Sequence, residues 1–199
     1  MKKSIIIHCS DVSEKLIANQ FDSVNRYHRD DRKFPVSSLG IYVGYNSFIT
    51  GGKNYKCRDD FEIGCHCNQE MDDKGNIYPY GSLKALSMNI QSFGVCVGFD
   101  GDIETMSDVH YELLKKQVWE WQDKYNIPNE KVFFHRKFAT DKTCPGKLLT
   151  DSWLAKLLNR GNIIPTESCM SEMKVIETQK QQIFNLQVFI RNLIAYFKK

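Results

Sequence analysis

The sequence of 199 residues lacks any run of about 18 consecutive apolar residues, so no segment is typical of a transmembrane helix. It also lacks a strong excess of charge, because 27 Lys and Arg stand against 24 Asp and Glu, a net charge of +3. This balance is too small to indicate a nucleic-acid-binding protein. Apolar residues make up 42% and charged residues 26% of the chain, which is typical of a folded protein rather than a disordered one.

The amino terminus lacks the apolar core of a signal peptide. Its basic start is followed by a run of apolar residues only at positions 5–7. A signal peptide needs a run of roughly 7 to 15 apolar residues. The chain also has seven cysteines, an odd number. Without an export signal, this count argues against a disulfide framework. We therefore expect reduced thiols and look among them for a metal ligand or a nucleophile.

The spacing of apolar residues predicts an α/β protein. Continuous apolar or β-branched runs predict strands, and three- and four-residue spacing predicts helices. The expected strands are 4–9, 40–50, one or two within 54–66, 92–99 and 131–134. The expected helices are 13–29, with Ser10 and Asp11 as capping residues, then 105–125 and 148–159. This alternation predicts a mixed central β-sheet flanked by helices over residues 1–159.

The last 40 residues differ in composition from the rest. Residues 160–171 are typical of a linker, and residues 172–199 predict one long amphipathic helix. Its apolar residues recur at steps close to a heptad: Ile176, Ile183, Leu186, Ile190, Leu193 and Phe197. We favour a homo-oligomer formed through this helix. The alternatives are packing against the preceding domain and, less favoured, contact with a membrane surface.

Three residues are candidate ligands for zinc. His8 ends the first expected strand, His135 ends the last, and Cys144 follows nine residues later. Imidazole and thiolate suit Zn²⁺, and three protein ligands leave a fourth position for water. The residues alone leave a purely structural role open for each of them.

Four segments, in this order, carry a resemblance to a known family: IIIHCS, VGYNSFIT, SFGVCVGFD and FFHRKFATDKTCPG. Over residues 4–158 the chain resembles the zinc-dependent N-acetylmuramoyl-L-alanine amidases of the type-2 amidase and peptidoglycan recognition protein family, and its phage-lysozyme branch most of all. The resemblance implies the family's mixed sheet, a zinc cofactor and peptidoglycan as the partner.

The resemblance also implies a role for individual residues. His8, His135 and Cys144 match the family's zinc ligands, while Tyr45 and Lys142 match its catalytic tyrosine and lysine. A bound zinc ion would supply hydroxide near neutral pH, and an ammonium and a phenol are suitable donors to a developing oxyanion. Taken singly, Tyr45 could equally be a core aromatic residue and Lys142 a solvated lysine.

Two further residues match the family's substrate groove. His66 corresponds to a groove histidine and Asn89 to a groove asparagine, so both are expected to bind substrate. The sequence departs from the family at Asn46, where a histidine usually follows the tyrosine. The polar loop at 68–88 is longer than in the short phage form, and it is expected to affect substrate preference.

The implied activity is hydrolysis of the amide bond between N-acetylmuramic acid and L-alanine. The absence of a signal peptide suits an endolysin that is made in the host cytoplasm and acts on the cell wall after release, and it would also suit a wall-recycling enzyme. The alternative is a non-catalytic peptidoglycan-binding or regulatory module of the same fold.

Four other cysteines and histidines have simpler expectations. His28 is expected to pack within its helix and His110 to lie on the exposed side of its helix, while Cys9 and Cys96 are expected to act as small apolar residues. A second metal site is an open alternative for the remaining thiols, Cys57, Cys65 and Cys67.

Overall fold

The computed structural model describes residues 2–161. The helix predicted at 172–199, with its expected oligomer and membrane contacts, lies outside the described residues, as does the linker from residue 162 onward. Within the described part, no helix combines the length and apolar character needed to cross a membrane.

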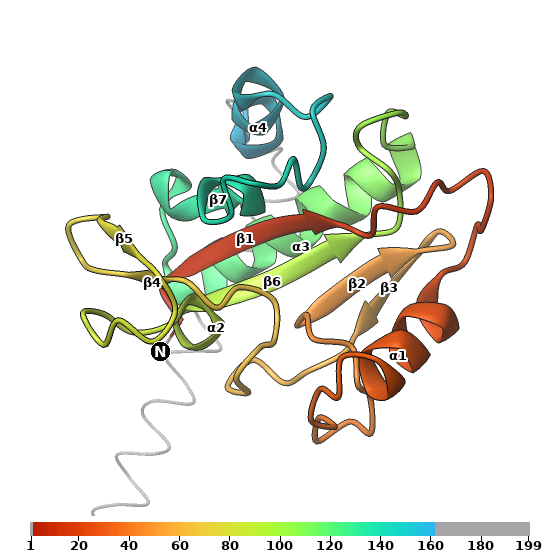
Figure 1. Ribbon diagram of the computed structural model, residues 1–199. Helices are drawn as coiled ribbons and strands as arrows, with labels where there is room; N and C mark the ends of the chain where they lie inside the picture. Colours follow the sequence, from red (N-terminus) through yellow and green to blue (C-terminus); the bar gives the residue numbers. More distant parts are fainter. Residues whose placement is uncertain (1, 162–199) are drawn as a thin grey trace, which may run out of the picture. The chain divides into compact units, whose positions relative to one another are not determined.

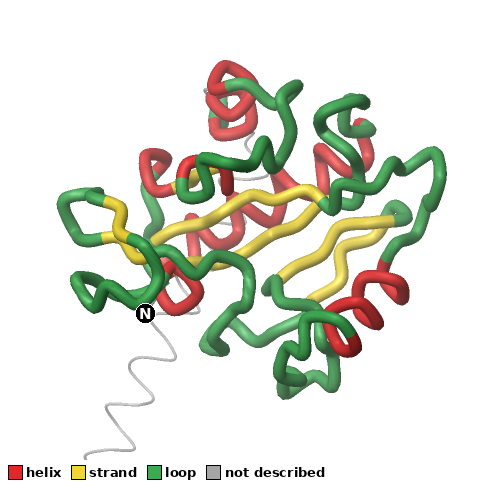
Figure 2. The backbone as a smooth tube through the Cα atoms, viewed as in Figure 1, coloured by secondary structure: helices red, strands yellow, loops and turns green. Residues whose placement is uncertain are grey.

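A mixed five-stranded sheet forms the centre of residues 2–159 (Figures 1 and 2). Its strands, in spatial order, are β3 (Lys53–Lys56), β2 (Ser47–Thr50), β6 (Ser92–Val97), β1 (Ser4–Cys9) and β7 (Val132–Phe134). β1 is parallel to both β6 and β7, β2 is parallel to β6, and β3 is antiparallel to β2. The predicted mixed sheet flanked by helices is therefore confirmed.

Four α-helices surround the sheet: α1 (Phe21–Asp30), α2 (Met88–Gln91), α3 (Asp108–Tyr125) and α4 (Asp151–Leu158). Two 3₁₀ turns, η1 (Asn129–Lys131) and η2 (His135–Lys137), flank β7. A small antiparallel hairpin, β4 (Glu70–Met71) with β5 (Ile77–Tyr78), lies apart from the main sheet (Figure 1). It occupies the segment that was predicted to be a loop at 68–88.

The sheet has two faces with different neighbours. In β1, Ile5, Ile7 and Cys9 belong to the large core that also contains residues of α3 and α4. Ile6 belongs to a separate cluster on the other face, since successive side chains of a strand point to opposite sides. His8 follows the same alternation and faces the side of Ile6. α1 also packs on this side, where its Phe21 and Val24 contact the cluster around Phe48 and Cys96.

The first helix begins at Phe21, so the predicted span of 13–29 and its caps at Ser10 and Asp11 are wrong. Contacts with distant residues hold the preceding segment in another conformation. The carboxylate of Glu104 accepts from the Ser13 hydroxyl at 2.9 Å and from the Glu14 N–H at 2.7 Å. The N–H of Gln20 donates to the Thr50 hydroxyl of β2 at 2.9 Å, which fixes the point where the helix starts.

The strand predicted at 40–50 is shortened to Ser47–Thr50. The reason is that two backbone donors before it bond to side chains of α1 and not to a neighbouring strand. The N–H of Tyr42 donates to Asn25 Oδ1 at 2.7 Å, and the N–H of Gly44 donates to His28 Nδ1 at 3.2 Å. Within 54–66, only the start belongs to a strand, β3. The other predicted strands and helices agree with the structure to within three residues at each end.

The expectation for His110 is wrong, because its side chain is fully buried. Its Nε2 accepts from the Gly52 N–H at 3.2 Å, and its Nδ1 lies 3.3 Å from Glu14 Oε2. The exposed residue at this point of α3 is Val109. Leu114, Val118 and Trp121 face the core.

Candidate functional site

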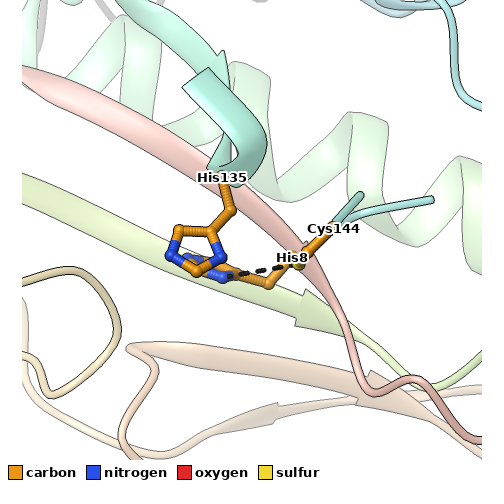
Figure 3. A group of neighbouring side chains, drawn as sticks. All are labelled: His8, His135 and Cys144. Carbon is orange, nitrogen blue, oxygen red and sulfur yellow. Dashed lines mark hydrogen bonds between the residues drawn. The ribbon is translucent and has the colours of Figure 1, made fainter. Parts of the chain in front are cut away.

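Three side chains from distant parts of the sequence converge at one edge of the sheet (Figure 3). His8 lies near the end of β1, His135 is the first residue of η2 directly after β7, and Cys144 lies in the loop before α4. Because β1 and β7 are parallel neighbours, with Ile7 opposite Phe134, their carboxyl ends meet at the same edge. One ligand atom from each residue lies within 4.8 Å of the other two.

The loop that carries Cys144 is fastened to the neighbouring backbone on both sides. The Arg136 N–H donates to the carbonyl of Cys144 at 2.7 Å, and the Arg136 guanidinium donates to the carbonyl of Gly146 at 2.9 Å. Asp102 accepts from the Thr143 hydroxyl at 2.8 Å and from the Lys147 N–H at 2.7 Å. Sequence reasoning missed both Arg136 and Asp102, since nothing local distinguishes them from solvated charges.

The protonation states of His8 and Cys144 suit a metal. Burial and the neighbouring His135 lower the pKa of His8 to about 4, so its imidazole is neutral near pH 7. Contact with Cys9, then with His135 and His8, holds the pKa of the Cys144 thiol well below its usual range. Neutral imidazole and thiolate are the forms that bind zinc. The donor set of two nitrogens and one sulfur therefore fits Zn²⁺ with one position left open.

Tyr45 and Lys142 line the same cleft as the three ligands, and its volume is about 610 Å³. The ring of Tyr45 lies 5.0 Å from that of His8, measured between centroids. Burial, together with nearby thiols, raises the pKa of Tyr45 well above its usual value, so the phenol keeps its proton. Lys142 is exposed, two residues before Cys144. The structure thus brings the two predicted catalytic residues to the predicted ligands.

The two predicted groove residues occupy different places. His66 is buried beside His8 and lines the cleft, with its Nδ1 3.1 Å from His8 Nε2. Asn89 does not line this cleft. Its Oδ1 accepts from the backbone N–H groups of His66 and Cys67, both at 2.7 Å. A direct contact between substrate and either residue stays a prediction.

Asn46, the departure from the family pattern, is buried away from the cleft. Its Oδ1 accepts from Lys2 Nζ at 2.9 Å and from the Gly94 N–H at 3.1 Å. The residue therefore links β6 to Lys2, which precedes β1, and does not line the cleft.

One wall of the cleft comes from α1 and the turn after it, including Val24, His28, Arg32 and Phe34. His28 is buried, as predicted, and accepts the hydrogen bond from Gly44 next to Tyr45. The wall places the cation Arg32 in the cleft. No sequence signal pointed to Arg32, because it belongs to a run of charges that is typical of a solvated turn.

The remaining cysteines lie in separate surroundings. Cys57 packs against Val43 and Phe48, whereas Cys67 packs against Ile6 and other residues of a different cluster. Among residues 2–161, His8, His135 and Cys144 form the one group of three side chains that is arranged to hold a metal. The alternative of a second metal site at Cys57, Cys65 and Cys67 is therefore not supported. Cys9 and Cys96 are buried in strands, as predicted.

Comparison with known proteins gives one family and several similar structures. The family model described as N-acetylmuramoyl-L-alanine amidase matches residues 2–147. The endolysin amidase LysCS from Clostridium intestinale is 18% identical with a TM-score of 0.56, over 79% of this chain and 84% of that one. Drosophila PGRP-LB is 21% identical with a TM-score of 0.53, over 83% and 86% of the two chains.

A third similar structure is the amidase AmiD from E. coli in complex with its substrate, anhydro-N-acetylmuramic acid-L-Ala-D-gamma-Glu-L-Lys. It is 14% identical with a TM-score of 0.52, over 78% of this chain and 57% of AmiD. No curated protein sequence matches the chain. At these identities, the similar structures establish the fold.

Proposed function

The chain belongs to the N-acetylmuramoyl-L-alanine amidase family, and on that premise we propose that it is a zinc-dependent hydrolase of peptidoglycan. The bond cleaved is the amide between the lactyl group of N-acetylmuramic acid and L-alanine. The observation that carries the proposal is that His8, His135 and Cys144 meet in one cleft with Tyr45 and Lys142.

His8, His135 and Cys144 would hold the zinc ion. When bound, zinc acidifies a coordinated water and polarises a carbonyl, which is the chemistry that amide hydrolysis needs near neutral pH. The residues of the chain have the remaining tasks. The cleft orients the scissile amide, and the three ligands keep their geometry because the strand ends and the Arg136 contacts fix them.

The developing oxyanion requires donors that are already in place. The Lys142 side chain and the Tyr45 phenol both line the cleft, and the raised pKa of Tyr45 keeps its hydroxyl protonated and able to donate a hydrogen bond. A positioned donor of this kind contributes roughly 10²–10³ in rate. The geometry leaves open which of the two gives the proton to the leaving amine.

The similar fold of LysCS, which is named as an endolysin, is in accord with an endolysin role for this chain. We propose synthesis in a host cytoplasm and action on the cell wall after release. The alternative is a binding module of the same fold. The presence of Cys144 and Lys142 beside the histidines favours the enzyme, because binding alone requires neither a third metal ligand nor an oxyanion donor.

The test is digestion of isolated sacculi by the full chain. We expect the turbidity to fall, excess chelator to stop the fall, and added zinc to restore it. The products should carry new L-alanine amino termini and no new reducing sugar ends. Clearing that continues in excess chelator would exclude the zinc mechanism, and binding to sacculi without any product would favour the binding module.

A further inference from the structure

His8 uses both of its ring nitrogens in the structure. Its Nδ1 faces Cys144, with 3.9 Å between the nitrogen and Sγ, and its Nε2 lies 3.1 Å from His66 Nδ1. The two imidazole planes meet at 85°, with 5.2 Å between ring centroids, so the edge of one ring points at the other. The two histidines therefore share a hydrogen bond. His8 belongs to the group of candidate ligands, and His66 does not.

The direction of this hydrogen bond follows from proton counting. A neutral imidazole carries one N–H, so a lone pair at His8 Nδ1 requires the proton at His8 Nε2. That N–H must then donate to His66 Nδ1. The proton of His66 must in turn lie on its Nε2, which is buried without a hydrogen-bond partner.

The surroundings of His66 leave little freedom for its ring. A Cβ at Gly64 would lie 2.5 Å from His66 Cδ2, and a Cβ at Gly94 would lie 2.6 Å from it. The imidazole of His66 can pack directly against the backbone because both of these positions are glycine. Gly94 lies opposite Ile6 of β1, two residues from His8. The side chain of Asn89 fixes the backbone N–H of His66, so the ring is held from its main chain as well.

We propose that His66 is a positioning residue that holds the imidazole of His8 in the tautomer and orientation needed for metal binding. The proposal rests on the zinc binding proposed above, and it gives His66 a role other than the contact with substrate that the sequence predicts. Without His66, the buried Nε2–H of His8 loses its acceptor, and the proton can move to Nδ1, where it blocks the lone pair. Partners of this kind typically contribute 10–100-fold to metal affinity.

The experiment is a zinc titration of the full chain in competition with a chromogenic chelator. His66→Leu and His66→Asn form a matched pair, since the two side chains have similar size and only asparagine offers an acceptor near the place of Nδ1. We expect His66→Leu to weaken zinc binding roughly 10–100-fold and His66→Asn to recover most of that loss. His110→Leu is the control, because it removes another fully buried imidazole from outside the cleft. Its zinc affinity should equal that of the wild type.

Kinetics at saturating zinc separate positioning from substrate contact. If His66 contacts the substrate instead, the His66→Leu variant should have a higher KM and an unchanged zinc dissociation constant. That result would overturn the positioning role. If the wild type binds zinc and both His66 variants bind it as tightly, the positioning role alone is overturned. If the wild type binds no zinc, the proposed function is overturned together with it.

A second variant covers the case in which His66→Leu does not fold. Asn89→Ala keeps the imidazole and releases the backbone N–H of His66. We expect a weaker zinc affinity than in the wild type, by a smaller factor than for the loss of the ring. A zinc affinity of Asn89→Ala equal to that of the wild type would then overturn the proposal.

Discussion

The two faces of the central sheet are built by the same strands and do different things. On the side of α3, Ile5 and Ile7 of β1 are fully buried among apolar residues. On the opposite side, His8 of the same strand meets His66, His135 and Cys144. Because the side chains of a strand alternate, one short segment contributes to stability on one face and to chemistry on the other. Substitutions on the two faces should therefore have separable effects.

The largest effect is expected at the chemical face. His8→Ala should remove most zinc binding and reduce the hydrolysis of sacculi to background, because two ligands remain of three. Zinc content per folded chain and release of L-alanine amino termini measure the two effects. A variant that keeps one tightly bound zinc ion would contradict the ligand assignment.

A smaller loss is expected at Lys142, which lines the cleft without belonging to the ligand group. Lys142→Ala should keep its zinc and lose about 10²–10³ in kcat, the typical cost of one oxyanion donor. Lys147→Ala is the matched control, since Lys147 is an exposed lysine of the same loop outside the cleft. Loss of zinc from the Lys142 variant would show that the residue has a structural task.

Substitutions on the core face should change the free energy of unfolding and leave the zinc affinity unchanged. Leu114→Ala, at a fully buried position of α3, should lower the free energy of unfolding by about 2–5 kcal/mol through the cavity it leaves. Val109→Ala on the exposed side of the same helix should change it by less than about 0.5 kcal/mol. Urea unfolding checks both values. A change in the zinc affinity of folded Leu114→Ala would show that the two faces are coupled.

The smallest effect concerns pH. Burial lowers the pKa of His28 to about 4, from an ordinary value of 6.5. Between these values the unfolded chain takes up a proton that the folded chain does not, so the free energy of unfolding decreases as pH falls from about 6.5 to about 4. In the metal-free protein, His28→Asn should lessen this decrease, because its amide oxygen can accept from Gly44 without titrating. Urea midpoints at about pH 7 and about pH 4.5 test this; an equal decrease in both proteins would contradict the role of His28.

Much of the site could be predicted from the sequence, and the contacts that could not be predicted have a common cause. His8, His135, Cys144, Tyr45 and Lys142 share one cleft as the ordered motifs predict. The substrate contact expected of Asn89 stays a prediction, whereas its hydrogen bonds from the backbone N–H groups of His66 and Cys67 were not foreseen. The motif identifies a residue type at a position, whereas the direction of a side chain depends on which donors lie around it.

The strands and helices also divide into features that the sequence predicts and features that it does not. Strand β1 was predicted over its full length, because a continuous apolar run buried on both faces is a local property of the chain. The start of α1 was misplaced by eight residues, from 13 to 21, because Glu104 and Thr50 compete for the polar groups of the segment before it. Apolar spacing in 13–20 is compatible with a helix, but it does not register distant hydrogen-bond partners.

The sequence by itself determined the alternation of strands and helices and the chemical nature of the ligands, since both follow from residue types and their short-range spacing. Only the tertiary structure decided that His66 meets His8 and that Arg136 and Asp102 hold the loop of Cys144. These contacts join segments brought together by the parallel pairing of β1 with β6 and β7. Their geometry depends on how the sheet and its loops pack, which short-range spacing does not encode.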